Sequence, residues 1–516
     1  MEYKWKALAI VNLGGLMGSI DATVLVIGFP SVARELGASL VEMVWVLMIY
    51  LVMGTALVLS LGRLSDMKGR KRLYTAGFLV FILGSGLCGF AGTGVELVLF
   101  RAIQGVGGAM LIANSFAIVS DAFPASERGR AFGINTIVWG AGSVLGIALG
   151  GLILAVTTWR WIFWINLPIG AVATVVGMLV LRESVTPNPK ETFDFPAAFL
   201  FVAGLLALLF GVTEGILTSW GAPETLGPIL LSAPLLVAFV LWEMRVSRDP
   251  ILPLSLFRSW PFSAGLLATV LQGLALFSTN FVLMIYFQGI RHVSVLTASL
   301  LLLPLFLALM VVGPVGGRLS DRYGARFLST LGLGVQALAL LLLSGLSAST
   351  PLALVAVYEG MLGVGGGLFF PANTAAIMAS SPPNRYGVAS GAMMTFRNTA
   401  VALSYVLALV ALTSRLPAGL GAQLFGGSFR PEATGLSPGE LTATFLSGMH
   451  AAFLIATACV VAAALFSALR GRHRWNELPA SSIAADRPAP RGLAGSIPLR
   501  AGSVERRPGD GPRGLS

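Results

Sequence analysis

Five polar residues fall inside long apolar stretches of the chain, where a charge is unfavourable. They are Asp21, Arg101, Gln104, Glu359 and Arg397. A carboxylate at the centre of a membrane-spanning helix costs about 2.5–3.5 kcal/mol, so such residues usually face a cavity or a partner. A buried carboxyl group can also exchange a proton in the physiological pH range. These residues are therefore candidates for proton exchange and for cation binding.

Two interpretations stay open for each of the first two residues. Asp21 is either a site of proton or cation exchange or one half of a structural ion pair buried between helices. Arg101 keeps its proton under all ordinary conditions. It either tunes a neighbouring carboxylate such as Asp21 and holds water or substrate, or it extends toward the outer membrane interface.

The elements that position these residues are predicted to be membrane-spanning helices. The chain has 516 residues, of which 56% are hydrophobic and 11% charged, and its mean hydropathy is +0.84. Crossing a hydrocarbon core of about 30 Å takes roughly 20 apolar residues in a helix. We predict fourteen such spans, at 7–30, 40–62, 73–92, 96–120, 130–156, 161–181, 196–215, 225–242, 262–288, 297–317, 327–346, 351–378, 387–413 and 442–468.

The net charge of +11 raises the question of nucleic-acid binding. Most of the 34 Lys and Arg residues, however, fall in the N-terminal segment, in alternate loops and in the C-terminal segment. The loops on the other side contain only Arg34, Arg160, Arg291, Arg415 and Arg430. This asymmetry follows the positive-inside rule and predicts that both termini lie in the cytoplasm. We therefore expect a lipid bilayer, and no nucleic acid, as the partner of the basic residues.

The chain repeats itself. GRLSDMKGRK at 62–71 returns as GRLSDRYGAR at 317–326, and GVGG at 105–108 returns at 363–366. The two GVGG segments are 258 residues apart, and the same spacing makes Glu359 the counterpart of Arg101. Eight predicted spans separate the two loops, so the halves are parallel repeats. The predicted organisation is an N-terminal six-helix bundle at 1–185, two extra linking helices at 186–258, a C-terminal six-helix bundle at 259–469 and a disordered cytoplasmic tail at 470–516.

These motifs resemble those of the major facilitator superfamily, and within it the 14-helix drug:proton antiporter family. The resemblance covers residues 5–470 and is carried by GSIDATVLVIGFPSV in the first span, by GRLSDMKGRKR, by FRAIQGVGGAML in the fourth span and by WRWIFWINLPIG before the sixth. It implies an all-α polytopic membrane protein with the major facilitator fold, in which two six-helix bundles and two extra helices give 14 transmembrane helices.

The repeated loop is the most specific part of the resemblance. Gly62, Asp66, Gly69 and Arg70 stand at its characteristic positions, and Asp321 is the aspartate of the second copy. Glycine permits a tight turn at a helix end, and an aspartate can cap a helix or pair with arginine. The resemblance implies a cytoplasmic gating loop, whereas the alternative is that these charges only determine topology.

A glycine series in the fifth span matches the antiporter motif of the same family. Gly142, Gly146 and Gly150 are four residues apart and Gly151 follows, so the first three form a stripe against which another helix can pack closely. One residue departs from the motif, because Ile147 stands where the family usually has proline. Similarly, Asn398 follows Arg397 where glutamine is usual.

Other classes of function lack support in the sequence. No GxxxxGK[ST] phosphate loop occurs, which argues against an ATP-driven pump. No Ser/His/Asp arrangement or metal-ligand spacing is present, since His292, His450 and His473 are scattered. We expect no enzyme activity, no metal and no cofactor, with a proton gradient as the source of energy.

The resemblance implies a secondary transporter of the plasma membrane that acts as a monomer and exports small lipophilic or cationic compounds in exchange for protons. Asp21 would be the main proton and cation site, with Arg101, Glu359, Gln104 and Arg397 around the same pathway. Two alternatives stay open. The departure at Ile147 favours a facilitator or symporter of a natural metabolite, and a protein of this fold can also be a membrane sensor or assembly subunit without transport.

Overall fold

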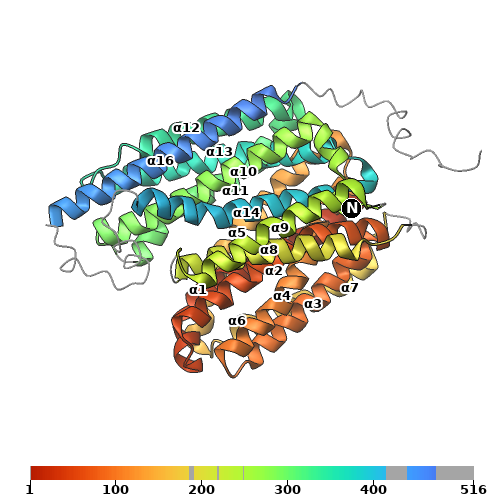
Figure 1. Ribbon diagram of the computed structural model, residues 1–516, viewed down its shortest axis with the longest axis horizontal. Coiled ribbons are helices and arrows are strands. Elements are labelled where there is room, and N and C mark those ends of the chain that lie inside the picture. The colour runs from red at the N-terminus through yellow and green to blue at the C-terminus, as the bar shows by residue number, and fades with distance from the viewer. Residues whose placement is uncertain are drawn as a thin grey trace, which may run out of the picture. The chain divides into compact units, whose positions relative to one another are not determined.

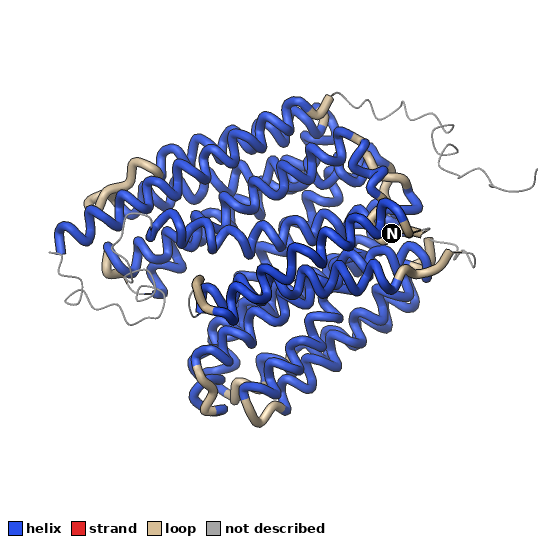
Figure 2. The backbone as a smooth tube through the Cα atoms, in the orientation of Figure 1, coloured by secondary structure: helices blue, strands red, loops and turns tan. Residues whose placement is uncertain are grey.

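The computed structural model describes residues 2–184, 191–217, 220–247, 249–293, 295–413 and 438–471. Over these ranges the regular secondary structure is helical, and no strand occurs in them (Figure 2). Thirteen of the described helices are long and apolar enough to cross a membrane. The prediction of an all-α polytopic membrane protein is confirmed. The predicted tail lies outside the described residues from 472 onward.

The first half of the chain forms a bundle in which most of the close packing joins helices that are not consecutive in sequence (Figure 1). Its helices are α1 (Tyr3–Leu36), α2 (Leu40–Lys68), α3 (Arg70–Phe90), α4 (Gly94–Ala122), α5 (Arg128–Val156), α6 (Trp161–Trp164) and α7 (Asn166–Val180). The sixth predicted span is thus divided into α6 and α7. Pro168, near the start of α7, has no N–H to donate to the preceding turn, which accounts for the break at Ile165.

The second half forms a matching bundle. Its helices are α10 (Trp260–Ile285), α11 (Val295–Tyr323), α12 (Ala325–Leu343), α13 (Leu352–Ala379), α14 (Tyr386–Thr413) and α16 (Pro438–Leu469). Two helices stand between the halves in sequence, α8 (Phe195–Leu217) and α9 (Pro223–Arg245). They pack on each other, and α8 also contacts α2 and α14, so the pair lies against the junction between the halves.

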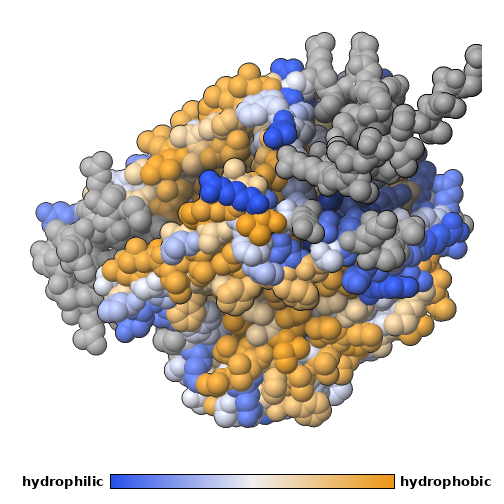
Figure 3. All heavy atoms as spheres, turned by 45° about the vertical axis from the view of Figure 1, so that its right-hand side comes forward, coloured by the Kyte–Doolittle hydropathy of each residue, from blue (hydrophilic) through white to orange (hydrophobic). Residues whose placement is uncertain are grey.

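The surface of the helices is largely apolar. Large apolar side chains such as Phe90, Leu179 and Phe199 are more than two-thirds exposed. Figure 3 shows apolar residues spread over the long sides of the helices and hydrophilic ones gathered near the helix ends. Apolar exposure on this scale suits hydrocarbon rather than water, and the polar ends suit the two membrane interfaces.

The two halves meet at one end of the molecule. Helix α5 packs on α11, and α2 packs on α14. Both repeated loops lie at this end, as does the N-terminal segment, where Lys4 Nζ is 2.8 Å from Glu127 Oε2. We call this end the basic side. At the other end Arg160 pairs with Glu35 within the first half.

Candidate functional site

Asp21 lies on α1 inside the first bundle, and its carboxylate accepts hydrogen bonds from three side chains. Arg101 Nη1 donates to Oδ2 at 2.7 Å, while Gln104 Nε2 and Asn166 Nδ2 donate to Oδ1 at 2.8 Å and 3.0 Å. These donors come from α4 and α7, and all four residues are at most 1% exposed. The structure therefore brings Asp21, Arg101 and Gln104 together as one buried network.

Further contacts fix the guanidinium group of Arg101. Its Nε donates to the carbonyl oxygen of Val46 on α2 at 3.2 Å, and its Cζ lies 4.6 Å from the centre of the Tyr50 ring. The Ser85 hydroxyl on α3 accepts from both Gln104 and Asn166, so five helices of the bundle share this network. The side chain of Arg101 is only 2% exposed and points into the bundle rather than toward a membrane interface.

The chemistry of this network follows from its donor count. The ionised form of Asp21 has a charged donor on one oxygen and two amide donors on the other, which stabilises the carboxylate. Through these hydrogen bonds and those of Arg101 and Ser85, Asp21 on α1 is connected to four other helices.

Glu359 has the opposite surroundings. It lies on α13 in the second bundle, is fully buried, and neither carboxyl oxygen has a hydrogen-bond partner among the described residues. An isolated carboxylate in an apolar interior carries a large desolvation penalty, so the uncharged carboxyl group is the form that this position accommodates. The structure does not join Glu359 to the Asp21 network, since the two belong to different bundles.

Arg397 of α14 borders a cavity of about 70 Å³ between the two halves. Its guanidinium lies 4.9 Å from the Phe370 ring centre and makes no ion pair or hydrogen bond within the part of the chain that the structure describes. No acidic residue lines this cavity in the described part of the chain. Its lining is Phe116, Phe132, Asn135, Thr136, Trp139, Thr269, Leu309, Phe370, Pro371, Asn373, Thr374, Met393, Met394 and Arg397.

Asp66 joins the two halves at the basic side. Its carboxylate accepts from the backbone N–H groups of Gly387 and Val388, both at 2.9 Å, in the first turn of α14. It also forms an ion pair with Arg70, at 2.6 Å, and Arg70 pairs in addition with Asp121. The sequence predicts that Asp66 caps the next helix or pairs with arginine. The helix it caps is instead one in the opposite half.

Asp321 makes the reciprocal contact. Its two oxygens accept from the N–H groups of Gly129 at 2.9 Å and Arg130 at 2.8 Å, in the first turn of α5. A carboxylate at a helix N-terminus satisfies unpaired N–H groups and complements the helix dipole. Each repeated loop thus places its aspartate on a helix of the other half. We call the contacts of Asp66 with α14 and of Asp321 with α5 the two cross-half caps.

The loop glycines have separate steric roles. A Cβ on Gly62 would overlap the carbonyl oxygen of Gly387, so glycine permits the backbones of α2 and α14 to touch. Gly69 has φ of +115°, a conformation that other residues rarely adopt. It lies between α2 and α3, beside Glu183, whose carboxylate accepts from the N–H of Lys71 at 3.2 Å.

The glycine series of α5 lies partly against α1. A Cβ on Gly142 would lie 2.6 Å from Ser19 Cβ, and one on Gly146 would overlap the Thr23 hydroxyl. Gly150 is buried. Gly151 takes no part in this packing, because it is exposed and a Cβ there would meet no atom within 4 Å.

This difference predicts the effect of adding one methyl group. Gly146→Ala should lower the free energy of unfolding by about 1–3 kcal/mol, because α1 must move away from α5. Gly151→Ala is the matched control and should leave stability unchanged or slightly higher, since alanine favours a helix over glycine. Thermal unfolding of the purified protein in detergent measures both variants. Equal loss of stability at the two positions would contradict the packing role of Gly146.

Comparison with known proteins agrees with this architecture. Residues 11–405 match the family model described as Major Facilitator Superfamily. The chain belongs to the major facilitator superfamily. It is accordingly a membrane transporter of small molecules, and its fold is the major facilitator fold.

Relatives within the superfamily carry several kinds of cargo. The chain is 33% identical over 423 residues to the multidrug resistance protein Stp of Mycobacterium tuberculosis, covering 81% of this chain and 76% of that protein. It is 27% identical over 486 residues to the tetracenomycin C resistance and export protein of Streptomyces glaucescens, covering 89% and 90%. It is 31% identical over 405 residues to the riboflavin transporter RibZ of Clostridioides difficile, covering 78% and 87%.

Solved structures of the superfamily share the fold at low sequence identity. The human organic anion transporter MFSD10 aligns with a TM-score of 0.59 and 15% identity, over 89% of this chain and 99% of that one. The proton:xylose symporter XylE aligns with a TM-score of 0.57 and 16% identity, over 90% and 95%.

The described residues contain no group of three or more His, Cys, Asp or Glu that could hold a metal ion.

Sequence reasoning missed two members of the Asp21 network. Asn166 stands in the segment WRWIFWINLPIG, which the sequence marks as an aromatic interface, and Ser85 is one small residue in a glycine-rich span. The signal that was available is an amide within an apolar span, because such a group needs a hydrogen-bond partner as much as a charge does.

Proposed function

We propose that this transporter exports small lipophilic compounds in exchange for protons, by alternating access of a cavity between its two halves. One observation carries the proposal. Each half buries a carboxyl group inside its own bundle, and these two groups have opposite surroundings: Asp21 has three donors, whereas Glu359 has none among the described residues. Paired acidic groups whose environments differ in this way are suited to holding and releasing protons in turn.

In the proposed cycle Asp21 is the main proton site, and Arg101 and Glu359 modulate it. The conformation described here corresponds to the ionised state of Asp21, with the halves closed at the basic side by the two cross-half caps. Protonation of Asp21 weakens its contact with Arg101, which frees α4 to move relative to α1. Rocking of the two bundles then exposes the cavity to the other side of the membrane.

The location of the protein completes the proposal. We place it as a monomer in the plasma membrane, with the basic side and both termini in the cytoplasm, because Lys and Arg concentrate on one side of the spans. Export as the direction of transport is supported by the relatives named for multidrug resistance and for tetracenomycin C export.

The deciding experiment follows protons in proteoliposomes with an imposed pH gradient. Lipophilic compounds, cationic and neutral, are added to vesicles that contain wild type, Asp21→Asn or Glu359→Gln. We expect substrate to dissipate the gradient with wild type and not with Asp21→Asn, because asparagine keeps an oxygen for Arg101 but cannot take up the proton. Glu359→Gln is expected to slow proton movement without abolishing it.

The matched control is Glu224→Gln, which removes an exposed acid at the start of α9. It should behave as wild type. Movement of the same compounds by wild type with no proton signal would replace the antiporter by a facilitator. A chain that binds these compounds but moves neither them nor protons would favour the sensor or assembly role.

A second candidate is transport of a natural aromatic metabolite. The cavity between the halves is lined by aromatic and amide side chains and by the cation of Arg397, and no described residue of its lining is an acid that could pair with a cationic drug. This lining favours neutral or anionic aromatic compounds, which offer π-faces and hydrogen-bond acceptors. The relative named as a riboflavin transporter is consistent with such a cargo.

The charge of Arg397 gives a direct test of that second candidate. Arg397→Gln should weaken binding of an aromatic carboxylate by about tenfold, the effect of losing one charge-assisted hydrogen bond, and should leave the corresponding neutral amide unaffected. Arg397→Lys, which keeps the charge, should retain most of the preference. Equilibrium binding to purified protein measures both compounds. An unchanged ratio of their affinities in Arg397→Gln would exclude Arg397 from substrate recognition.

A further inference from the structure

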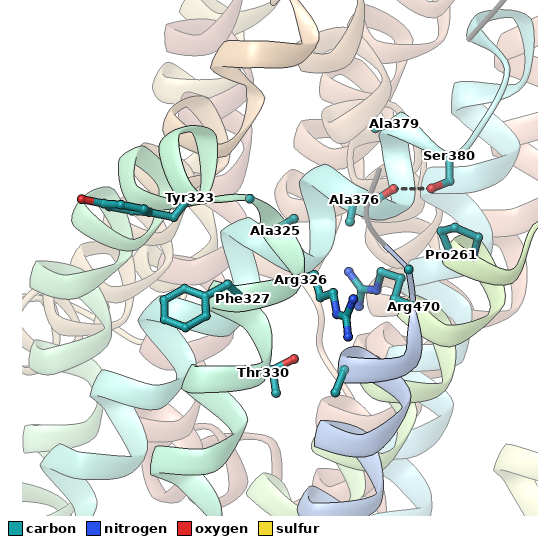
Figure 4. Close-up of a pocket in the computed structure, with 13 residues that line it drawn as sticks. Pro261, Tyr323, Ala325, Arg326, Phe327, Thr330, Ala376, Ala379, Ser380 and Arg470 are labelled. Atoms are coloured by element: carbon teal, nitrogen blue, oxygen red, sulfur yellow. Dashed lines mark hydrogen bonds between the residues drawn. The ribbon is translucent and has the colours of Figure 1, made fainter. Parts of the chain in front are cut away.

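A large cavity of about 740 Å³ opens at the basic side of the second bundle, apart from the cavity between the halves. Figure 4 shows how the starts of α10 and α12 and the ends of α13 and α16 surround it. Trp260, at the start of α10, is 45% exposed and donates to the carbonyl oxygen of Leu469 at 2.9 Å. An exposed tryptophan with a polar contact is typical of the membrane interface, so the cavity lies at the level of lipid headgroups.

Among the described residues, two arginines and no acid line this cavity. Arg470 is only 4% exposed, donates from Nη2 to Asn373 Oδ1, and has no partner for Nε or Nη1 among the described residues. Burial lowers its pKa to about 10, which reflects the cost of a cation that lacks a counter-ion. Arg326, on the first turn of α12, also lines the cavity and is not part of an ion pair in the described structure.

The internal repeat shows what is missing here. In the first half, the start of α3 is capped by Glu183, which accepts from the N–H groups of Lys71 and Arg72. At the equivalent start of α12, after Gly324, no described side chain accepts from the backbone N–H groups. Helix α16 packs on α12 as α7 packs on α3, but beyond the end of α16 the chain places Arg470 beside the cavity. Among the described residues no anion takes the place of Glu183 here, and two arginines lie at this helix start.

An apolar groove continues from the cavity along the outside of α12. It has a volume of about 450 Å³ and shares Phe327 and Thr330 with the cavity. It then follows Leu331, Gly334 and Leu338, a length of about 16 Å from Phe327 at the helical rise. The large side chains along it are about half exposed, and a Cβ on Gly334 would meet no atom within 4 Å.

We propose that the cavity and the groove together bind one anionic phospholipid. Its phosphate lies between Arg326 and Arg470 at the start of α12, and one acyl chain follows the groove toward Leu338. Basic pockets between helices at a membrane surface recognise anionic headgroups, and the adjoining groove selects a lipid over a free phosphate. Arg470 also contacts Asn373, which lines the cavity between the halves, so the headgroup lies one side chain away from that cavity.

The test is native mass spectrometry of the full chain in detergent, titrated with phosphatidylglycerol, phosphatidylcholine or glycerol 3-phosphate. Wild type should retain one phosphatidylglycerol at concentrations where the other two compounds do not bind. Arg470→Gln should weaken this binding by about tenfold, the effect of removing a charged donor. Gly334→Trp should weaken it similarly by filling the groove, and because its side chain faces lipid it does not disturb the fold.

The matched control is Arg245→Gln, which removes an exposed arginine at the end of α9 on the same side. It should bind phosphatidylglycerol as wild type does. Equal retention of phosphatidylcholine, or unchanged affinity in both Arg470→Gln and Gly334→Trp, would overturn the proposal. Binding of glycerol 3-phosphate as tight as that of the lipid would also overturn it, since the site would then be one for a free phosphate compound.

Discussion

Replacing Arg101 with leucine is expected to lower the free energy of unfolding by about 3–5 kcal/mol, because the change leaves Asp21 as an unpaired buried charge. Removing the guanidinium also removes the side-chain hydrogen bond to the carbonyl oxygen of Val46. The measurement is thermal unfolding in detergent followed by a thiol-reactive dye. The dye reports on Cys88, which is fully buried in the folded protein, in a chain whose Cys459 is replaced with alanine.

A double variant separates loss of the pair from simple loss of packing. Replacing both charges, in Arg101→Leu combined with Asp21→Asn, should recover most of the stability, because no unpaired charge then stays buried. If the double variant is as unstable as Arg101→Leu alone, the effect comes from the volume of the arginine rather than its charge. The single variant Asp21→Asn should be intermediate, since its amide oxygen still accepts from Arg101.

Replacing Asp66 with alanine is expected to shift the balance of conformations away from closure at the basic side. The carboxylate accepts two backbone hydrogen bonds from α14, and losing them should cost the closed form about 2 kcal/mol, or roughly thirtyfold in population. Spin labels at Lys68 and Asn384, both exposed and on opposite halves, report the opening as a longer distance in the resting protein.

Two further variants make this prediction specific to the cross-half caps. Asp121→Asn removes a charge that also pairs with Arg70 but that caps no helix of the other half, so its distance distribution should match wild type. Asp321→Ala removes the reciprocal cap on α5 and should open the basic side as Asp66→Ala does. If the spin-label distances are unchanged in both Asp66→Ala and Asp321→Ala, the loop charges only determine topology.

The two cross-half caps also show why a motif can be found without its partner. The carboxylates accept from backbone N–H groups, which every residue except proline possesses, so nothing in the residue types at the start of α5 or α14 marks them as the donors of the contact. The glycines are a partial signal. Gly129 and Gly387 would each carry a Cβ too close to the opposite loop, but the sequence alone does not say which of the chain's 62 glycines has this role.

The sequence by itself determined the class of protein, the repeat and the positions of the intramembrane charges. Hydrophobicity over some 20 residues is a local property, and lipid requires each span to satisfy its own backbone hydrogen bonds, so spans can be predicted without knowing what they contact. A charge such as Arg101 or Glu359 inside a span is equally visible, because an intramembrane charge is rare.

Only the tertiary structure decided which of those charges meet. Asp21 and Arg101 are 80 residues apart and form one ion pair, Glu359 has no partner among the described residues, and Arg397 borders the cavity between the halves. Soluble helices reveal their buried face through an alternation of polar and apolar residues. In this protein the lipid-facing and buried faces are both apolar, so the rotation of each helix, and with it every contact between distant residues, depends on packing between helices.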